Sequence, residues 1–283
     1  MRNVRIYGLL AVTLMAAGCS SGSGAGTTPG PSSASAAQPA VVGAVTAHVA
    51  GRTVSGHCRG VQKGRPAIIL EAGDGSGQSQ LQALEEHFAA TTLACSYDRA
   101  GIGTSSPPAT TPRPLDDLVA DLDAFAAATP LRGPFVIVGQ SLGGNIALRY
   151  AELHPDRAAG FVAMNPVPPA TAYLPRVHKV EKPTEYQDEV AFYAGDNDEK
   201  VDLRPSSELT GTLPGSLPYA VMFDEDCDGD SAFCATVLPS LTTTLKELAA
   251  LGDGGRFVRA PGAGHELFHE ASDLVYRTVD GLA

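Results

Sequence analysis

The stretch 134–151, PFVIVGQSLGGNIALRYA, decides the fold. It opens with an apolar run, Phe135 to Val138, that is typical of a central strand in a parallel sheet. Gly139-Gln140-Ser141-Leu142-Gly143 follows, and apolar residues then recur at helical spacing from Leu142 to Leu153. A serine between two glycines, placed between a strand and a helix, predicts a nucleophile elbow. Ser141 is therefore the candidate nucleophile.

The G-x-S-x-G pattern is weak evidence by itself, because the chain contains 31 glycines. A second match is centred on Ser20, in a segment with neither a strand before it nor a helix after it. The context separates the two serines. Small residues beside Ser141 permit a sharp turn, and the following helix start supplies a backbone N–H and a favourable dipole where negative charge develops.

Strands and helices alternate through most of the chain. The segment 45–58 predicts a hairpin that turns at Ala50-Gly51-Arg52. The other predicted strands are 67–73, 91–98, 134–139, 159–165, 217–223 and 256–260, and the predicted helices are 78–90, 115–128, 142–153, 238–251 and one from about 270. The pattern lapses from 166 to 217, where prolines and acidic residues are frequent. This alternation predicts an α/β fold with a mostly parallel central sheet flanked by helices.

Four stretches in one order, LEAGDG, YDRAGIGTSS, VGQSLGGNIALRYA and GAGH, resemble the α/β-hydrolase family over residues 44–283. The resemblance implies an α/β-hydrolase fold and places the segment 166–217 where this family carries a cap. It is strongest with lipid-anchored extracytoplasmic bacterial hydrolases whose oxyanion loop reads E-x-G. In YDRAGIGTSS we expect Asp98 and Arg99 to brace their loop.

The resemblance also assigns the catalytic roles. It makes Ser141 the nucleophile and His265 the proton shuttle, with an acid after the strand 217–223 to orient the histidine. Three aspartates follow that strand. We favour Asp226, then Asp228 and then Asp224, because the spacing of the family varies here.

Two backbone N–H groups are implied as oxyanion donors, those of Leu142 and Asp74. Asp74 departs from the usual pattern, because an acidic side chain beside a developing oxyanion would oppose it unless the carboxylate points away.

His265-Glu266-Leu267-Phe268-His269 matches H-E-x-x-H, the pattern of zinc peptidases. That pattern binds zinc when one helix projects both histidines, with a third ligand downstream. Here PGAG precedes His265, which predicts a loop, and only 14 residues follow His269. We therefore expect no metal and no organic cofactor.

The first residues predict an exported lipoprotein. Arg2 and Arg5 precede the apolar stretch Ile6–Ala17, and Ala16-Ala17-Gly18-Cys19 looks like a lipobox. We expect a signal peptide at 1–18, a lipidated Cys19 with a flexible linker at 19–43, and the hydrolase domain at 44–283. The protein would then lie on the extracytoplasmic face of the cell membrane, held there by its lipid. An ordinary secretory signal is the alternative.

Four other cysteines remain, an even number that suits an oxidising compartment. Three pairings are possible. We favour Cys58–Cys95 and Cys227–Cys234, the latter because so short a loop closes easily; four free thiols are the alternative.

The formal net charge of −11 makes nucleic acid a poor partner, since phosphate backbones are repelled. The function we expect is a serine hydrolase that cleaves a carboxylic ester or similar small acyl substrate through an acyl-enzyme. The alternatives are an amidase or peptidase of the same fold, and a lipoprotein that binds a ligand without catalysis.

Overall fold

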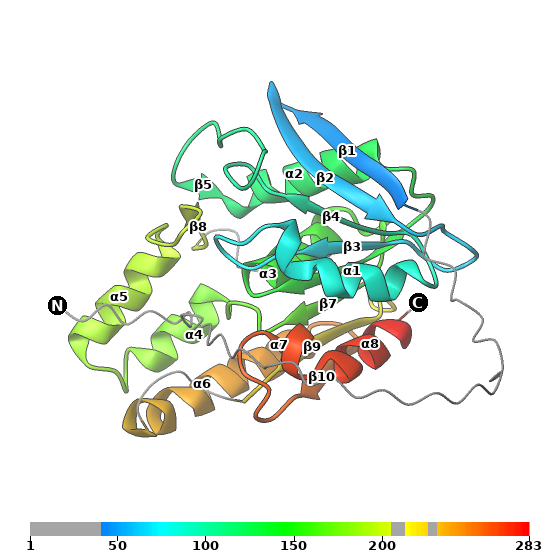
Figure 1. Cartoon of the computed structure of the whole chain (residues 1–283). Helices are drawn as coiled ribbons and strands as arrows, with labels where there is room; N and C mark the ends of the chain where they lie inside the picture. Colours follow the sequence, from blue (N-terminus) through cyan, green and yellow to red (C-terminus); the bar gives the residue numbers. More distant parts are fainter. Residues whose placement is uncertain (1–40, 205–212, 226–230, 283) are drawn as a thin grey trace, which may run out of the picture.

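An eight-stranded sheet forms the centre of the described structure, a computed structural model that describes residues 41–204, 213–225 and 231–282 (Figure 1). The strand order is β1-β2-β4-β3-β6-β7-β9-β10. The first three strands pair antiparallel, and all later neighbours pair parallel, which confirms the predicted α/β-hydrolase fold class. The strands are β1 (Val41–Val49), β2 (Arg52–Arg59), β3 (Ile68–Glu71), β4 (Ala94–Asp98), β6 (Phe135–Gln140), β7 (Ala158–Met164), β9 (Tyr219–Phe223) and β10 (Gly255–Arg259).

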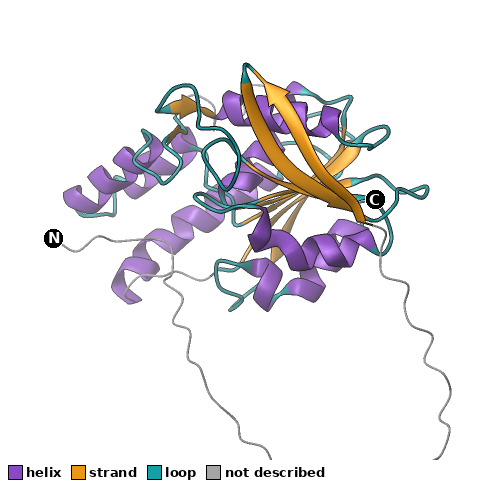
Figure 2. Cartoon of the chain, turned by 45° about the horizontal axis from the view of Figure 1, so that its top comes forward, coloured by secondary structure: helices purple, strands orange, loops and turns teal. Residues whose placement is uncertain are grey.

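Helices cover both faces of this sheet (Figure 2). Alternate residues of β6 explain why: Phe135 and Ile137 enter the core on one face, whereas Val136 and Val138 enter the core on the other. One face is covered by α2 (Leu115–Ala128), α3 (Leu142–Leu153) and α6 (Ser231–Ala249), and the other by α1 (Gln82–Ala89) and α8 (Ser272–Asp280), with the short α7 (Leu267–Glu270) beside α8.

The segment between β7 and β9 is more regular than its sequence predicts. It contains α4 (Ala170–Val177), α5 (Pro183–Tyr193) and β8 (Val201–Asp202), which pairs with β5 (Arg113–Pro114) in a separate two-stranded sheet. The expectation that the regular pattern lapses here was wrong, because frequent prolines do not exclude helices. Proline at the first helical position is favourable, as in α5, and α4 tolerates one near its end. We call the residues from α4 to β8 the cap.

Other element boundaries show where the sequence pattern is informative. The structure reproduces the predicted bounds of α2 and α3, and the predicted hairpin turns at Ala50 and Gly51, where φ is 47° and 77°. The helix predicted from 238 instead begins at Ser231. The helix predicted from 78 opens with a 3₁₀ turn, η1 (Gln78–Leu81).

A disulfide bond joins Cys58 on β2 to Cys95 on β4, the pairing that the sequence favoured. The two residues face each other in the antiparallel register and are fully buried. The predicted signal peptide, the lipidated Cys19 and the linker up to residue 40 lie outside the described residues, as does Cys227, and these remain predictions. The predicted end of the linker at residue 43 was wrong, because residues 41–43 already belong to β1, which pairs with β2. Among the described helices, none combines the length and apolar character needed to cross a bilayer.

A polar cluster anchored on His57 connects β2 to α1. Nε2 of His57 lies 2.9 Å from Oε1 of Glu85, and Nδ1 lies 2.6 Å from Oε1 of Gln78. The orientation of the Gln78 amide is fixed, because its Nε2 donates to Asp98. Both ring nitrogens therefore lie near acceptor oxygens, an arrangement that favours the protonated imidazolium. The hydrogen bond to Glu85 raises the pKa of His57 despite partial burial and the nearby charge of Arg59.

The raised pKa of His57 predicts a stability that falls with rising pH. The stabilisation is fully present below the ordinary pKa of 6.5 and is lost as pH rises through the folded value. Because the side chain is 25% exposed, the expected loss is modest, on the order of 1 kcal/mol. The midpoint of urea unfolding should be measured at about pH 5.5 and at about pH 9. The difference between the two midpoints should be smaller in His57→Gln than in the wild type. His48→Gln, at an exposed position on the same hairpin, should preserve the wild-type difference.

Candidate active site

Ser141 occupies a strained turn between β6 and α3. Its φ of 52° and ψ of −120° lie where a non-glycine residue is rarely found. The two flanking glycines are required by space: a Cβ on Gly139 would lie 2.1 Å from the carbonyl oxygen of Gly143, and a Cβ on Gly143 would lie 2.4 Å from that of Glu71. The G-x-S-x-G spacing therefore follows from the packing of α3 against the ends of β6 and β3.

The hydroxyl of Ser141 is shielded from solvent. The residue is 2% exposed, and Oγ has no hydrogen-bond partner in the described part of the chain. Its backbone N–H donates to the carbonyl of Met164 at 2.8 Å, which fixes the turn against β7. A buried hydroxyl that no internal acceptor holds is available to a ligand or a neighbouring base, as nucleophilic catalysis requires.

His265 lies in the loop after β10, as its glycine-rich approach predicts. Two amides hold the carbonyl oxygen of His265: Nε2 of Gln140 donates at 2.8 Å and Nδ2 of Asn165 at 2.9 Å. Gln140 immediately precedes Ser141, so the first of these bonds attaches the histidine loop to the elbow. Nε2 of His265 is also shielded from solvent.

Asn165 connects that loop to the end of β9. Its Nδ2 donates to Oδ2 of Asp224 at 3.1 Å, and its Oδ1 accepts the backbone N–H of Asp224 at the same distance. Asp224 is 5% exposed. Asp226 and Asp228 lie outside the described residues, so the preference for Asp226 remains a prediction. The sequence did not single out Asn165. Its φ of 44° is a conformation that asparagine tolerates, but no sequence pattern marks it.

The loop after β3 lies against the elbow, where the oxyanion donors are expected. A Cβ on Gly73 would lie 3.6 Å from Cβ of Ser141. The carboxylate of Asp74 accepts backbone N–H groups of the cap, from Asp198 at 2.8 Å and from Glu199 at 3.0 Å. The cap thus holds the carboxylate of Asp74. The acidic side chain therefore does not count against the backbone N–H of Asp74 as an oxyanion donor. Leu142, the other predicted donor, is the first residue of α3, where N–H groups lack an intrahelical acceptor.

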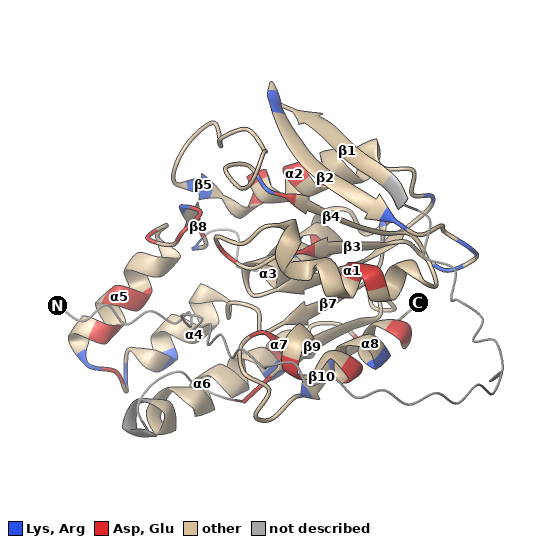
Figure 3. Cartoon of the chain, viewed as in Figure 1, with Lys and Arg blue, Asp and Glu red and all other residues tan. Residues whose placement is uncertain are grey.

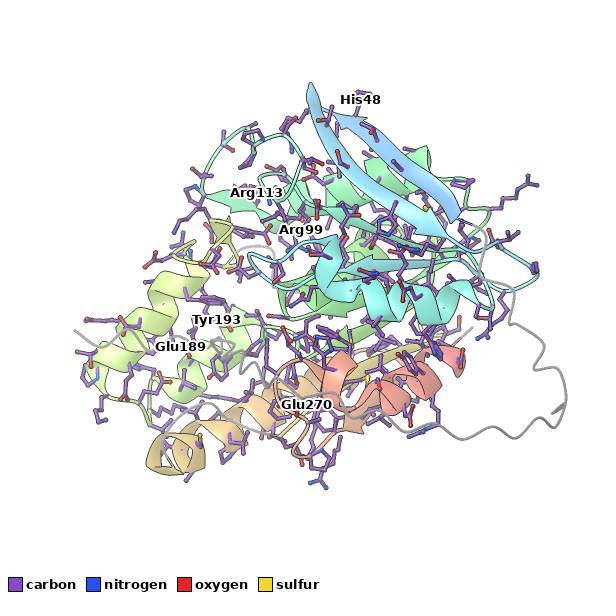
Figure 4. The ribbon with its side chains drawn as sticks, viewed as in Figure 1. His48, Arg99, Arg113, Glu189, Tyr193 and Glu270 are labelled. Carbon is purple, nitrogen blue, oxygen red and sulfur yellow. A yellow bond between two sulfur atoms is a disulfide. The ribbon has the colours of Figure 1, made fainter. Side chains whose placement is uncertain are left out.

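Arg99 braces this loop after β3, whereas the sequence predicted that it would brace its own loop. Its guanidinium donates to the carbonyl oxygens of Ala72 at 2.8 Å and Gly73 at 2.6 Å, and lies 3.3 Å from the carboxylate of Glu71. Burial raises the pKa of Glu71 to about 7, although the charge of Arg99 opposes the rise. Figure 4 shows Arg99 beside Arg113, between the central sheet and the cap. Asp98 holds the other end of the loop by accepting the backbone N–H of Gln78 at 2.8 Å.

The H-E-x-x-H pattern does not form a zinc-peptidase helix. His265 is in a loop, and His269 lies on the four-residue α7 with a side chain that is 56% exposed. Within residues 41–204, 213–225 and 231–282, no three His, Cys, Asp or Glu side chains gather as a metal site would need.

Known proteins share this architecture. The structure matches a thermophilic esterase from Thermogutta terrifontis with a TM-score of 0.55 and 17% identity, over 87% of this chain and 97% of that one. It matches the enol-lactonase from Burkholderia xenovorans LB400 with a TM-score of 0.58 and 20% identity, over 84% and 98%. At these identities the likeness shows the fold alone.

Sequence comparison gives a nearer relationship over a shorter stretch. The chain is 36% identical over 110 residues to "Putative carbamate hydrolase RutD" of Caulobacter vibrioides, and the match covers 36% of this chain and 38% of that relative. The chain thus matches well under half of the relative's length. The family model described as the alpha/beta hydrolase fold matches residues 69–220, more than half of the 283-residue chain, and includes the elbow. The chain therefore belongs to the α/β-hydrolase fold family.

Proposed function

We propose that this protein is a serine hydrolase that cleaves a carboxylic ester, or a similar acyl substrate, through a covalent acyl-enzyme. One observation carries the proposal. The hydroxyl of Ser141 is buried at the start of α3, and the residue before it holds the backbone of His265 by a 2.8 Å hydrogen bond. A nucleophile, a base and a helix start that favours negative charge are the components of acyl transfer.

The proposed reaction has two halves. Oγ of Ser141 attacks the acyl carbon while His265 accepts the hydroxyl proton, and the N–H groups of Leu142 and Asp74 receive the oxyanion. The bond from the acyl carbon to the leaving oxygen then breaks, and His265 returns the proton to that oxygen. Water, activated by His265, attacks the acyl-enzyme and releases the carboxylic acid. An aspartate after β9, with Asp226 preferred, orients the histidine.

Carbamates are a second candidate substrate class. Relatives that match over part of the chain are named "Putative carbamate hydrolase RutD", and a carbamate also presents an acyl carbon bonded to a leaving heteroatom. Because nitrogen donation makes a carbamate carbonyl less electrophilic, we expect esters to react faster in a general assay.

A panel of p-nitrophenyl esters from acetyl to palmitoyl, with a p-nitrophenyl carbamate and a p-nitroanilide, tests the proposed function. We expect turnover of at least the short esters, slower turnover of the carbamate, and no effect of EDTA. Preference for the anilide would support the amidase alternative. If no acyl substrate turns over, the protein is better described as a binding module.

A further inference from the structure

Two loops that are distant in sequence hold each other at the edge of the proposed site. The carboxylate of Asp74 accepts the N–H groups of Asp198 and Glu199, and Oε1 of Glu199 accepts the N–H of Gly75 at 3.1 Å. The oxyanion loop and the end of the cap are thus joined in both directions. A Cβ on Gly75 would lie 2.9 Å from the carboxylate of Asp198, so the side chain of Asp198 lies close against the backbone of Gly75.

Glu199 continues into a buried ionic network. Its Oε2 accepts Nε of Arg99 at 3.0 Å and Nη2 of Arg113 at 3.0 Å, and its Oε1 also accepts Nη2 of Arg99. The three side chains are only 1–2% exposed. Burial alone would raise the pKa of Glu199, but the charges of Arg99 and Arg113 outweigh it and leave the pKa below its ordinary value. Figure 3 shows basic and acidic positions together where β5 meets β8.

This network reaches the peptide group that is expected to hold the oxyanion. Nη2 of Arg99, the nitrogen that Glu199 engages through Oε1, also donates to the carbonyl oxygen of Gly73 at 2.6 Å. That oxygen and the N–H of Asp74 belong to one planar trans peptide group, so they point in opposite directions. Fixing the oxygen on Arg99 therefore fixes the direction of the N–H.

We propose that Glu199, a residue of the cap, is a positioning residue for the oxyanion donor of Asp74, acting through Arg99 and through its own contacts with the loop. This inference rests on the proposed function. It makes the cap part of the catalytic apparatus, because the donor is correctly aimed only while Glu199 stays between Arg99 and Arg113.

Glu199→Gln tests the proposal, since it keeps the shape of the side chain and removes the charge. A small misplacement of a catalytic group lowers the rate by up to roughly 10²-fold, so we expect kcat for p-nitrophenyl acetate to fall roughly 10- to 100-fold with KM little changed. The inhibition constant of a trifluoromethyl ketone, which forms an oxyanion on the serine, should rise by a similar factor. Asp196→Asn, at an exposed carboxylate of the same loop, should retain wild-type values.

Circular dichroism and the melting temperature show whether Glu199→Gln folds. Should it not fold, Asp74→Ala removes the two hydrogen bonds that the Asp74 carboxylate accepts from Asp198 and Glu199 while keeping the backbone N–H of Asp74, and losses of the same kind are expected. A folded Glu199→Gln enzyme with wild-type kcat and inhibition constant would overturn the proposal, as would a rise in KM alone. An inactive wild type that also resists fluorophosphonate labelling would overturn the proposed function, and with it this role.

Discussion

Ser141→Ala is expected to lower kcat/KM for an ester by about 10³-fold or more. Without the hydroxyl no acyl-enzyme can form, and only water attack assisted by the oxyanion donors remains. The side chain is buried and has no hydrogen-bond partner in the described residues, so removing one oxygen breaks no internal bond. The melting temperature should therefore stay close to that of the wild type, and the loss should appear in activity alone.

The chain provides a matched control for this change. Ser20 also lies at the centre of a G-x-S-x-G pattern, but in the segment that the sequence predicts to be a linker. Ser20→Ala should leave activity unchanged, and His265→Ala should lose activity on the scale of Ser141→Ala, because the pair acts as a unit. If Ser141→Ala keeps its activity, Ser141 is not the nucleophile, and its G-x-S-x-G pattern has no more catalytic meaning than the one centred on Ser20.

Asp226→Asn is expected to lower kcat by roughly 10³- to 10⁴-fold. An acid that accepts the Nδ1 proton of the catalytic histidine sets its tautomer and stabilises the imidazolium, and an amide in its place favours the wrong tautomer. The loss should appear in kcat while KM changes little, since the acid does not contact the substrate. Steady-state kinetics on the best ester of the panel measures both.

Asp224→Asn is the control that separates the candidate acids. The carboxylate of Asp224 accepts Nδ2 of Asn165, and the amide oxygen of an asparagine can accept the same bond. We therefore expect the fold to survive and activity to fall less than about 10-fold. If the large loss follows Asp224 and spares Asp226, the preference taken from the sequence is wrong, and the acid is the buried residue that shares Asn165 with His265.

Much of the fold could be predicted because local patterns were strong. The apolar runs of β3 and β6 are those of buried parallel strands, and the helical spacing in α2 and α3 gave their bounds without error. The elbow was predictable for the same reason: its glycines are needed where α3 meets the ends of β6 and β3.

The remaining features depend on contacts between distant parts of the chain. Glu199 meets Arg99 and Arg113, 100 and 86 residues away, and nothing near it in sequence indicates burial. Asn165 likewise gains its role only when β7, β9 and the loop of His265 meet. In the cap, α4 and α5 carry prolines near the end and at the start of the helix, positions that helices tolerate, so a high proline content there does not indicate irregular structure.

Covalent labelling is the most direct measurement of the central claim that Ser141 is a nucleophile served by His265. The full chain is incubated with a fluorophosphonate, and its intact mass and tryptic peptides are analysed. The account predicts a single phosphonyl adduct on Ser141, absent from Ser141→Ala and formed far more slowly in His265→Ala. An adduct on another serine, or labelling that persists in Ser141→Ala, would contradict it.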